Sequence, residues 1–126
     1  MVGLVLVSHS ARLAAGLVEL IAQLAPDVTV TTAAGTSDGR IGTSPDDVAA
    51  ALPAADSGDG VVIIPDLGSA VLSVRVALED VDETRYVLVD APFVEGAVSA
   101  AVTAGTGATL AEVIAAAEEA RTIGKF

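Results

Sequence analysis

Four short apolar stretches, each followed by a segment of helical character, constrain the fold of this 126-residue chain more than any other feature. They cover residues 2–7, 28–34, 61–64 and 86–89, and are rich in Val with Leu or Ile, except that Val and Thr dominate the second. The first is apolar without alternation, which is typical of a strand covered on both faces. Alternating strands and helices favour an open, mainly parallel sheet with helices on both faces. We therefore predict an α/β fold, one domain over residues 1–126, with four strands in the common order 2-1-3-4.

Apolar residues at helical spacing predict which face of each helix packs on this sheet. For the first helix, with Ser10 as its N-cap and Pro26 after its end, the predicted inner face is Leu13, Leu17, Leu20, Ile21 and Leu24. For the helix over about 94–104 it is Val94, Val98, Ala101 and Val102. Ser44 is expected to cap a short helix that ends near Leu52 and Pro53, and Thr109 and Glu112 to form a capping box.

The composition excludes several classes of function. A net charge of −11 with only six basic residues disfavours binding to nucleic acid or to an anionic membrane. The absence of cysteine excludes disulfides and thiolate metal sites, and a single histidine disfavours a zinc site, so no metal or cofactor is expected. No apolar run reaches membrane-spanning length, and the first residues do not follow a signal-peptide pattern, which together predict a cytoplasmic protein.

His9, the only histidine of the chain, follows the first strand directly. A side chain there projects from the carboxyl end of the strand, where parallel sheets place their ligand sites. Imidazole is the side chain whose unperturbed pKa lies nearest neutral pH, which makes His9 a candidate nucleophile or proton carrier. The alternative is that His9 is a surface residue or a helix cap.

The predicted strand order brings a carboxylate into the same crevice as His9. Strands one and three are neighbours in the order 2-1-3-4, and their ends carry Ser8-His9-Ser10 and Asp66-Leu67-Gly68-Ser69. A carboxylate that accepts a hydrogen bond from one ring nitrogen fixes the tautomer and leaves the other nitrogen nucleophilic. Asp66 is therefore predicted to orient His9. The alternative is that Asp66 only caps the helix that follows it.

The helices expected after His9 and after Gly68 direct free amide groups toward this crevice, which suits an anion. The candidate phosphate-binding residues are Ser10, Gly35, Thr36, Gly68 and Ser69. Gly68 allows close approach of the backbone to a phosphoryl oxygen, and Gly35 and Thr36 offer donors from the other side. Ser69 is more simply interpreted as a helix cap, and Thr36 as a loop residue.

Other catalytic classes lack their motifs in this chain. Neither Ser8 nor Ser10 lies in the Gly-x-Ser-x-Gly pattern of a serine hydrolase. Neither a Walker A sequence nor a Gly-x-Gly-x-x-Gly follows the first strand. A receiver domain would carry an acidic cluster where this chain has His9.

Four motifs, in this order, resemble the mannose-type enzyme IIA domain of the phosphoenolpyruvate-dependent phosphotransferase system. They are Leu-Val-Leu-Val-Ser-His-Ser near the start, Ala-Gly-Thr-Ser-Asp-Gly-Arg-Ile-Gly-Thr-Ser at 34–44, Asp-Leu-Gly-Ser-Ala at 66–70, and Ala-Pro-Phe-Val-Glu-Gly-Ala at 91–97. More narrowly, they are similar to the DhaM group of this family, the phosphotransferase subunits of dihydroxyacetone kinase.

The resemblance implies that His9 accepts a phosphoryl group from HPr at Nε2 and passes it to ADP on the nucleotide-binding subunit of the kinase. It also implies that Asp66 bonds the imidazole ring and that the protein is a homodimer. Some members carry HPr-like and enzyme I-like domains after this one. Since the sequence stops at Phe126, it is either a single-domain member served by a separate HPr or a fragment.

Two other functions stay open from the residues. The first is a mannose-type enzyme IIA that passes its phosphoryl group to an enzyme IIB of a sugar system. The second is a non-enzymatic, flavodoxin-like regulatory module that binds an anion or a partner, with His9 as a pH-sensitive contact.

Overall fold

A four-stranded, all-parallel sheet forms the centre of the computed structural model, which describes residues 1–126. Its strands are β1 (Gly3–Ser8), β2 (Val30–Ala34), β3 (Val61–Pro65) and β4 (Tyr86–Leu88). Their order is β2-β1-β3-β4, and all three pairings are parallel. The predicted fold class and strand order are therefore confirmed.

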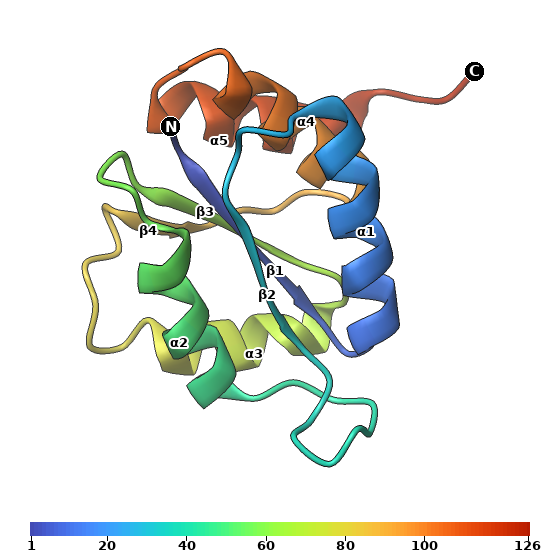
Figure 1. Ribbon diagram of the computed structural model, residues 1–126, viewed down its shortest axis with the longest axis vertical. Helices are drawn as coiled ribbons and strands as arrows, with labels where there is room; N and C mark the ends of the chain where they lie inside the picture. The colour runs from blue at the N-terminus through green and yellow to red at the C-terminus, as the bar shows by residue number, and fades with distance from the viewer.

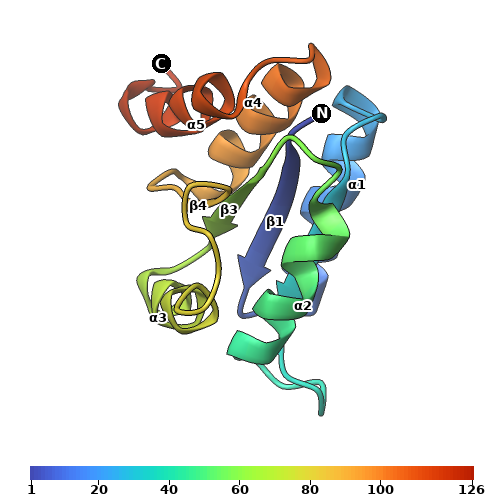
Figure 2. The same ribbon diagram turned by 90° about the vertical axis from the view of Figure 1, so that its left-hand side faces the viewer.

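Five helices and a terminal 3-10 turn surround the sheet. They are α1 (Ala11–Leu24), α2 (Pro45–Ala55), α3 (Gly68–Ala77), α4 (Phe93–Gly105), α5 (Leu110–Glu119) and the turn Ala120–Thr122. Figure 1 shows α1, α4 and α5 on one side of the sheet and α2 and α3 on the other. Figure 2, turned by 90°, shows the arrowhead of β1 pointing toward the end of the molecule where the loop before α2 projects. No helix is long and apolar enough to cross a bilayer.

The core has two layers because β1 and β3 are buried on both faces. In β1, Leu4 and Leu6 face the layer under α1, α4 and α5, and Val5 and Val7 face the layer under α2 and α3. All four side chains are fully buried. This explains why the first strand is apolar without alternation.

The predicted caps are present. The hydroxyl of Ser10 accepts from the amide of Leu13, and Thr109 and Glu112 form the reciprocal capping box of α5. Ser44 caps α2, and this helix ends two residues beyond the predicted end near Pro53. The helix continues to Ala55, which is 1% exposed against the sheet, so packing of a strong helix former outweighs the proline.

Two predicted helix faces are partly wrong. In α1 the buried residues are Ala14, Leu17 and Ile21, while Leu13, Leu20 and Leu24 are 46%, 44% and 52% exposed. The fully buried side chains of α4 are alanines: Ala97, Ala100, Ala101 and Ala104. Val94 and Val102 are instead 41% and 45% exposed. Small side chains allow close packing of a helix, so the largest apolar residues of α4 are not the ones that it buries.

Gly3 and Gly16 are expected to respond in opposite directions to substitution by alanine. A Cβ on Gly3 would lie 2.0 Å from the carbonyl oxygen of Ala55, whereas one on Gly16 has nothing within 4 Å. Gly3→Ala should lower the free energy of unfolding by about 3 kcal/mol, since overpacking a core commonly costs 1–3 kcal/mol. Gly16→Ala should raise it by about 0.5–1 kcal/mol, because alanine is the better helix former. Urea unfolding measures both, and a Gly3→Ala variant as stable as the wild type would contradict this packing.

Asp56 joins the end of α2 to the start of β4. Its carboxylate accepts from Arg85 Nε at 2.5 Å and Nη2 at 2.8 Å and from the Tyr86 hydroxyl at 3.0 Å. The hydrogen bonds from Arg85, the largest cause, together with those from Gly58 and Tyr86, lower the pKa of Asp56 from 3.8 to about 2, against the opposing effect of burial.

Asp56→Asn is expected to destabilise the protein by about 1.5–3 kcal/mol at pH 7, the range for hydrogen bonds to charged groups. Because the pKa is lower in the folded state, the ionised carboxylate stabilises the fold above pH 3.8, and this contribution is lost as the pH falls toward about 2. Urea unfolding at several pH values should therefore show the difference between wild type and variant shrinking below pH 3.8. A difference that is constant with pH would exclude this linkage.

Candidate active site

The sheet register places the ends of β1 and β3 side by side. Val7 pairs with Pro65, and the amide of Asp66 donates to the carbonyl of Val7 at 2.9 Å, which continues the ladder beyond β3. Ser8 and His9 on one strand end therefore lie next to Asp66 on the other. The two groups that the order of the elements predicted to lie together, His9 and Asp66, are in direct contact.

His9 and Asp66 are joined by two hydrogen bonds. The ring Nδ1 lies 2.9 Å from Oδ1 of Asp66, and the backbone N–H of His9 donates to Oδ2 at 3.0 Å. The side chains are 19% and 7% exposed, so the ring reaches the surface while the carboxylate is buried. An ionised carboxylate can only accept, so Nδ1 carries the proton of the neutral ring and Nε2 holds the free lone pair.

The Asp66 carboxylate is saturated with donors. Oδ1 also accepts from the amide of Leu67 at 2.7 Å, and Oδ2 accepts from the hydroxyl of Ser8 at 2.9 Å. Burial acts to raise the pKa of Asp66, but the hydrogen bonds from the backbone and ring of His9, from Ser8 and from Leu67 outweigh it and lower the pKa below 3.8. Asp66 is therefore ionised at neutral pH and able to accept from the imidazole.

Ser69 contacts the second nitrogen of the ring. Its Oγ lies 2.8 Å from Nε2 of His9, so the hydroxyl donates to the lone pair of the neutral ring. The interpretation of Ser69 as a helix cap is wrong: the N-cap of α3 is Leu67, and no side chain caps this helix. Ser69 lies two residues into α3, where its hydroxyl is directed at His9 instead of at the backbone.

Ser8 is a site residue to which the sequence assigned no role. It is fully buried, its hydroxyl donates to Asp66, and its oxygen accepts from the amide of Ser10 at 3.1 Å. A polar residue at the end of an unbroken apolar run was the only signal of this in the sequence. The Ser10 hydroxyl in turn accepts from the amide of Leu13, and this N-cap bond also holds the start of α1 beside the site.

The hydrogen-bonding groups of Gly35 and Thr36 are used by β1 and by the loop before α2. The amide of Gly35 donates to the carbonyl of Ser8 at 3.1 Å. The hydroxyl of Thr36 donates to Asp38 and accepts from the amide of Arg40. Neither residue therefore presents an unused donor to His9. The amides of Gly68 and Ser69 are different, because they open α3 and no backbone carbonyl accepts from them.

A cleft of about 300 Å³ lies beside Asp66 between α3 and the end of β4, and Arg75 and Asp90 are among its lining residues.

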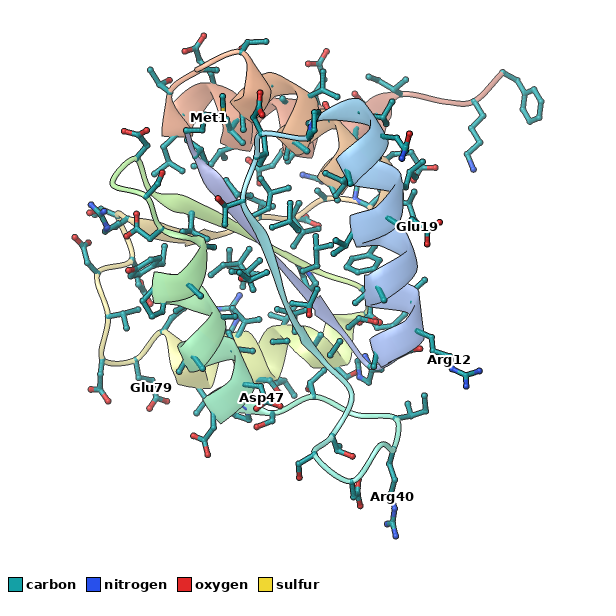
Figure 3. The ribbon with its side chains drawn as sticks, viewed as in Figure 1. Met1, Arg12, Glu19, Arg40, Asp47 and Glu79 are labelled. Atoms are coloured by element: carbon teal, nitrogen blue, oxygen red, sulfur yellow. The ribbon has the colours of Figure 1, made fainter.

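The loop before α2 is held against the end of β1 at His9, because the amide of Gly42 donates to the His9 carbonyl at 2.9 Å. Figure 3 shows Arg12 and Arg40 at this end of the molecule, both pointing outward. The imidazole of His9 is therefore partly exposed, with Nδ1 on the buried Asp66 carboxylate and Nε2 on the Ser69 hydroxyl.

Three comparisons place the chain in a family. The family EIIA-man, described as "PTS system fructose IIA component", matches residues 3–114. The phosphoryl donor subunit DhaM of PEP-dependent dihydroxyacetone kinase 1 from Listeria innocua is 42% identical over 79% of this chain and 78% of its own length. The crystal structure of EF1359, a protein of unknown function, is similar with a TM-score of 0.82 and 39% identity over 94% of this chain and 95% of that one.

A longer relative matches over only part of its length. The phosphoryl donor subunit DhaM from Providencia stuartii is 37% identical over 95% of this chain, which covers 27% of that protein. The fold and these matches define an enzyme IIA domain of the phosphotransferase system. The chain belongs to the mannose-type enzyme IIA family, in the group formed by the DhaM subunits.

Proposed function

We propose that this chain is a phosphoryl carrier in which Nε2 of His9 accepts a phosphoryl group from phospho-HPr and passes it to ADP held by the nucleotide-binding subunit of a dihydroxyacetone kinase. The observation that carries the proposal is the bond from Nδ1 of His9 to the ionised Asp66, which leaves Nε2 as the nucleophilic atom at the surface.

Two displacements at phosphorus make up the relay. In the first, the Nε2 lone pair attacks the phosphorus of the donor, and the bond from that phosphorus to the donor breaks as the new N–P bond forms. In the second, a β-phosphate oxygen of ADP attacks, and the N–P bond breaks to give ATP. Positive charge develops on the ring during the attack, and Asp66, 2.9 Å from Nδ1, stabilises it.

Ser69 and the start of α3 are the proposed ligands of the phosphoryl oxygens. The Ser69 hydroxyl already lies 2.8 Å from Nε2, so it has to leave the lone pair and turn to an incoming oxygen. The unused amides of Gly68 and Ser69 open the same helix and suit an anion. The hydroxyl of Ser10 is a further donor, whereas the internal contacts of Gly35 and Thr36 argue against a role for them.

The relatives favour the dihydroxyacetone system over a sugar system. The similar proteins from Listeria innocua and Providencia stuartii carry the name of phosphoryl donor subunits of dihydroxyacetone kinase. The proposed partners follow from this: HPr as donor, and the nucleotide-binding kinase subunit as acceptor. A sugar-system enzyme IIB is the acceptor to be tested against it.

The test is a single-turnover transfer from the isolated phosphorylated protein to each acceptor. We expect ATP to form, and the protein to lose its phosphoryl group, when the nucleotide-binding kinase subunit loaded with ADP is added. An enzyme IIB of a mannose-type system should receive little. Rapid transfer to enzyme IIB without ATP formation would overturn the choice of acceptor.

We also propose a homodimer, as the family resemblance implies. Exposed apolar side chains along α1, namely Leu13, Leu20 and Leu24, offer surface that a second copy could cover. Light scattering should give twice the chain mass of 12.4 kDa. A monomer at concentrations of tens of micromolar would contradict this part of the proposal.

A further inference from the structure

Ser8 connects three parts of the site through one buried hydroxyl. It ends β1, its Oγ donates to Oδ2 of Asp66 at 2.9 Å, and the same oxygen accepts from the amide of Ser10 at 3.1 Å, where α1 begins. Ser8 is the only polar residue of the chain that is fully buried. Burial of a hydroxyl is costly unless its hydrogen bonds are made, and here the donor and an acceptor lone pair are both used.

We propose that Ser8 is a positioning residue for phosphoryl transfer, which holds the Asp66 carboxylate in the orientation that fixes the tautomer of His9. This rests on the proposed function of His9. Ser8 does not face the reacting nitrogen and acts only through Asp66. Without it, Oδ2 keeps a single donor, the His9 amide at 3.0 Å, so the carboxylate is held less firmly in the plane that faces the ring.

Four donors hold the carboxylate, and Ser8 is the only one that a substitution can delete without removing the imidazole. Two of the others are the backbone amides of His9 and Leu67, and the fourth is the ring itself. The titratable and charged groups near Asp66 are His9 from the end of β1, and Arg75 from α3 and Asp90 after β4, which line the same cleft as Asp66. Substitution at Ser8 changes none of these charges.

Ser8→Ala is expected to slow the phosphorylation of His9 by phospho-HPr at pH 7 about tenfold, the effect of losing one charge-assisted hydrogen bond. Ser99→Ala is the matched control, because Ser99 makes one hydrogen bond to the carbonyl of Ala116 between α4 and α5, far along the chain from His9. This control should keep the wild-type rate. Thermal unfolding confirms that both variants are folded, and Ser8→Cys, with its weaker donor, replaces Ser8→Ala if the latter does not fold.

A double-substitution cycle separates positioning from a general structural role. If Ser8 acts through Asp66, Ser8→Ala adds no further loss of rate in the Asp66→Ala background. The same tenfold loss in that background would overturn the proposal.

An independent test is the NMR titration of the Asp66 carboxyl carbon, whose midpoint is the pKa of that group. Ser8→Ala should raise this pKa, because the hydrogen bond from Ser8 favours the ionised carboxylate. An unchanged midpoint would show that Ser8 does not hold the carboxylate. A wild-type protein that phospho-HPr does not phosphorylate would overturn the proposed function itself, while the titration would still report on Ser8.

Discussion

His9→Ala is expected to abolish phosphoryl acceptance while the fold stays intact. His9 is the only histidine of the chain, so no second imidazole can replace its Nε2. Its side chain is 19% exposed at the end of β1, outside the two core layers, so removing the ring opens no large internal cavity. The loss of activity should therefore be complete, and the loss of stability small.

Intact mass after incubation with phosphoenolpyruvate, enzyme I and HPr measures this result. Wild-type protein should gain one acid-labile phosphoryl group, and His9→Ala should gain none although HPr in the same tube is phosphorylated. Omitting enzyme I controls for other phosphoryl sources. A phosphoryl group on the His9→Ala variant would exclude His9 as the carrier. No gain on either protein would favour the anion-binding regulatory module.

Asp66→Asn is expected to lower the rate of His9 phosphorylation roughly 10²- to 10⁴-fold, as loss of the orienting carboxylate does in a catalytic triad. Asp66 accepts from four donors through two oxygens, whereas asparagine offers one oxygen and one NH₂ group. If the amide nitrogen faces Nδ1, the proton moves to Nε2 and blocks the nucleophile. If the oxygen faces Nδ1, the NH₂ group meets the amide of His9.

The rate of His9 phosphorylation is measured at pH 7 by quenching the reaction at set times. Asp59→Asn is the matched control. Asp59 lies just before β3, at the opposite end of the sheet from His9. Its side chain is 62% exposed and forms an ion pair with the amino group of Met1. This variant should be phosphorylated at the wild-type rate. Because hydrogen bonding lowers the pKa of Asp66 below 3.8, its carboxyl carbon should keep the chemical shift of the ionised form from pH 8 to pH 5. A titration of this carboxyl group within that window would contradict an ionised Asp66.

The sequence was sufficient to predict the part of the site that follows from topology. The alternation of apolar stretches and helices predicts a parallel sheet, and the common strand order 2-1-3-4 for such a sheet brings His9 and Asp66 to neighbouring strand ends. Continuation of the register beyond β3, through the bond from Asp66 to Val7, then makes the 2.9 Å contact possible.

Other features depend on side-chain packing that periodicity does not encode. Ser69 contacts Nε2 across 60 residues of sequence because it lies at the second position of α3, which no cap pattern indicates. Ser8 lies in an apolar run and its partners belong to other elements. In α4 the alanines are buried and Val94 and Val102 are exposed, because close packing selects small volume over large hydrophobicity.

The most direct test of the central claim is the ¹⁵N NMR spectrum of the imidazole before and after phosphorylation. With one histidine in the chain, both ring nitrogens are assigned without ambiguity. We predict a protonated Nδ1 and a bare Nε2 in the free neutral protein, and an N–P bond at Nε2 with Nδ1 still protonated afterwards. Phosphorylation at Nδ1, or a free protein with its proton on Nε2, would contradict the role of Asp66 in fixing the tautomer of His9.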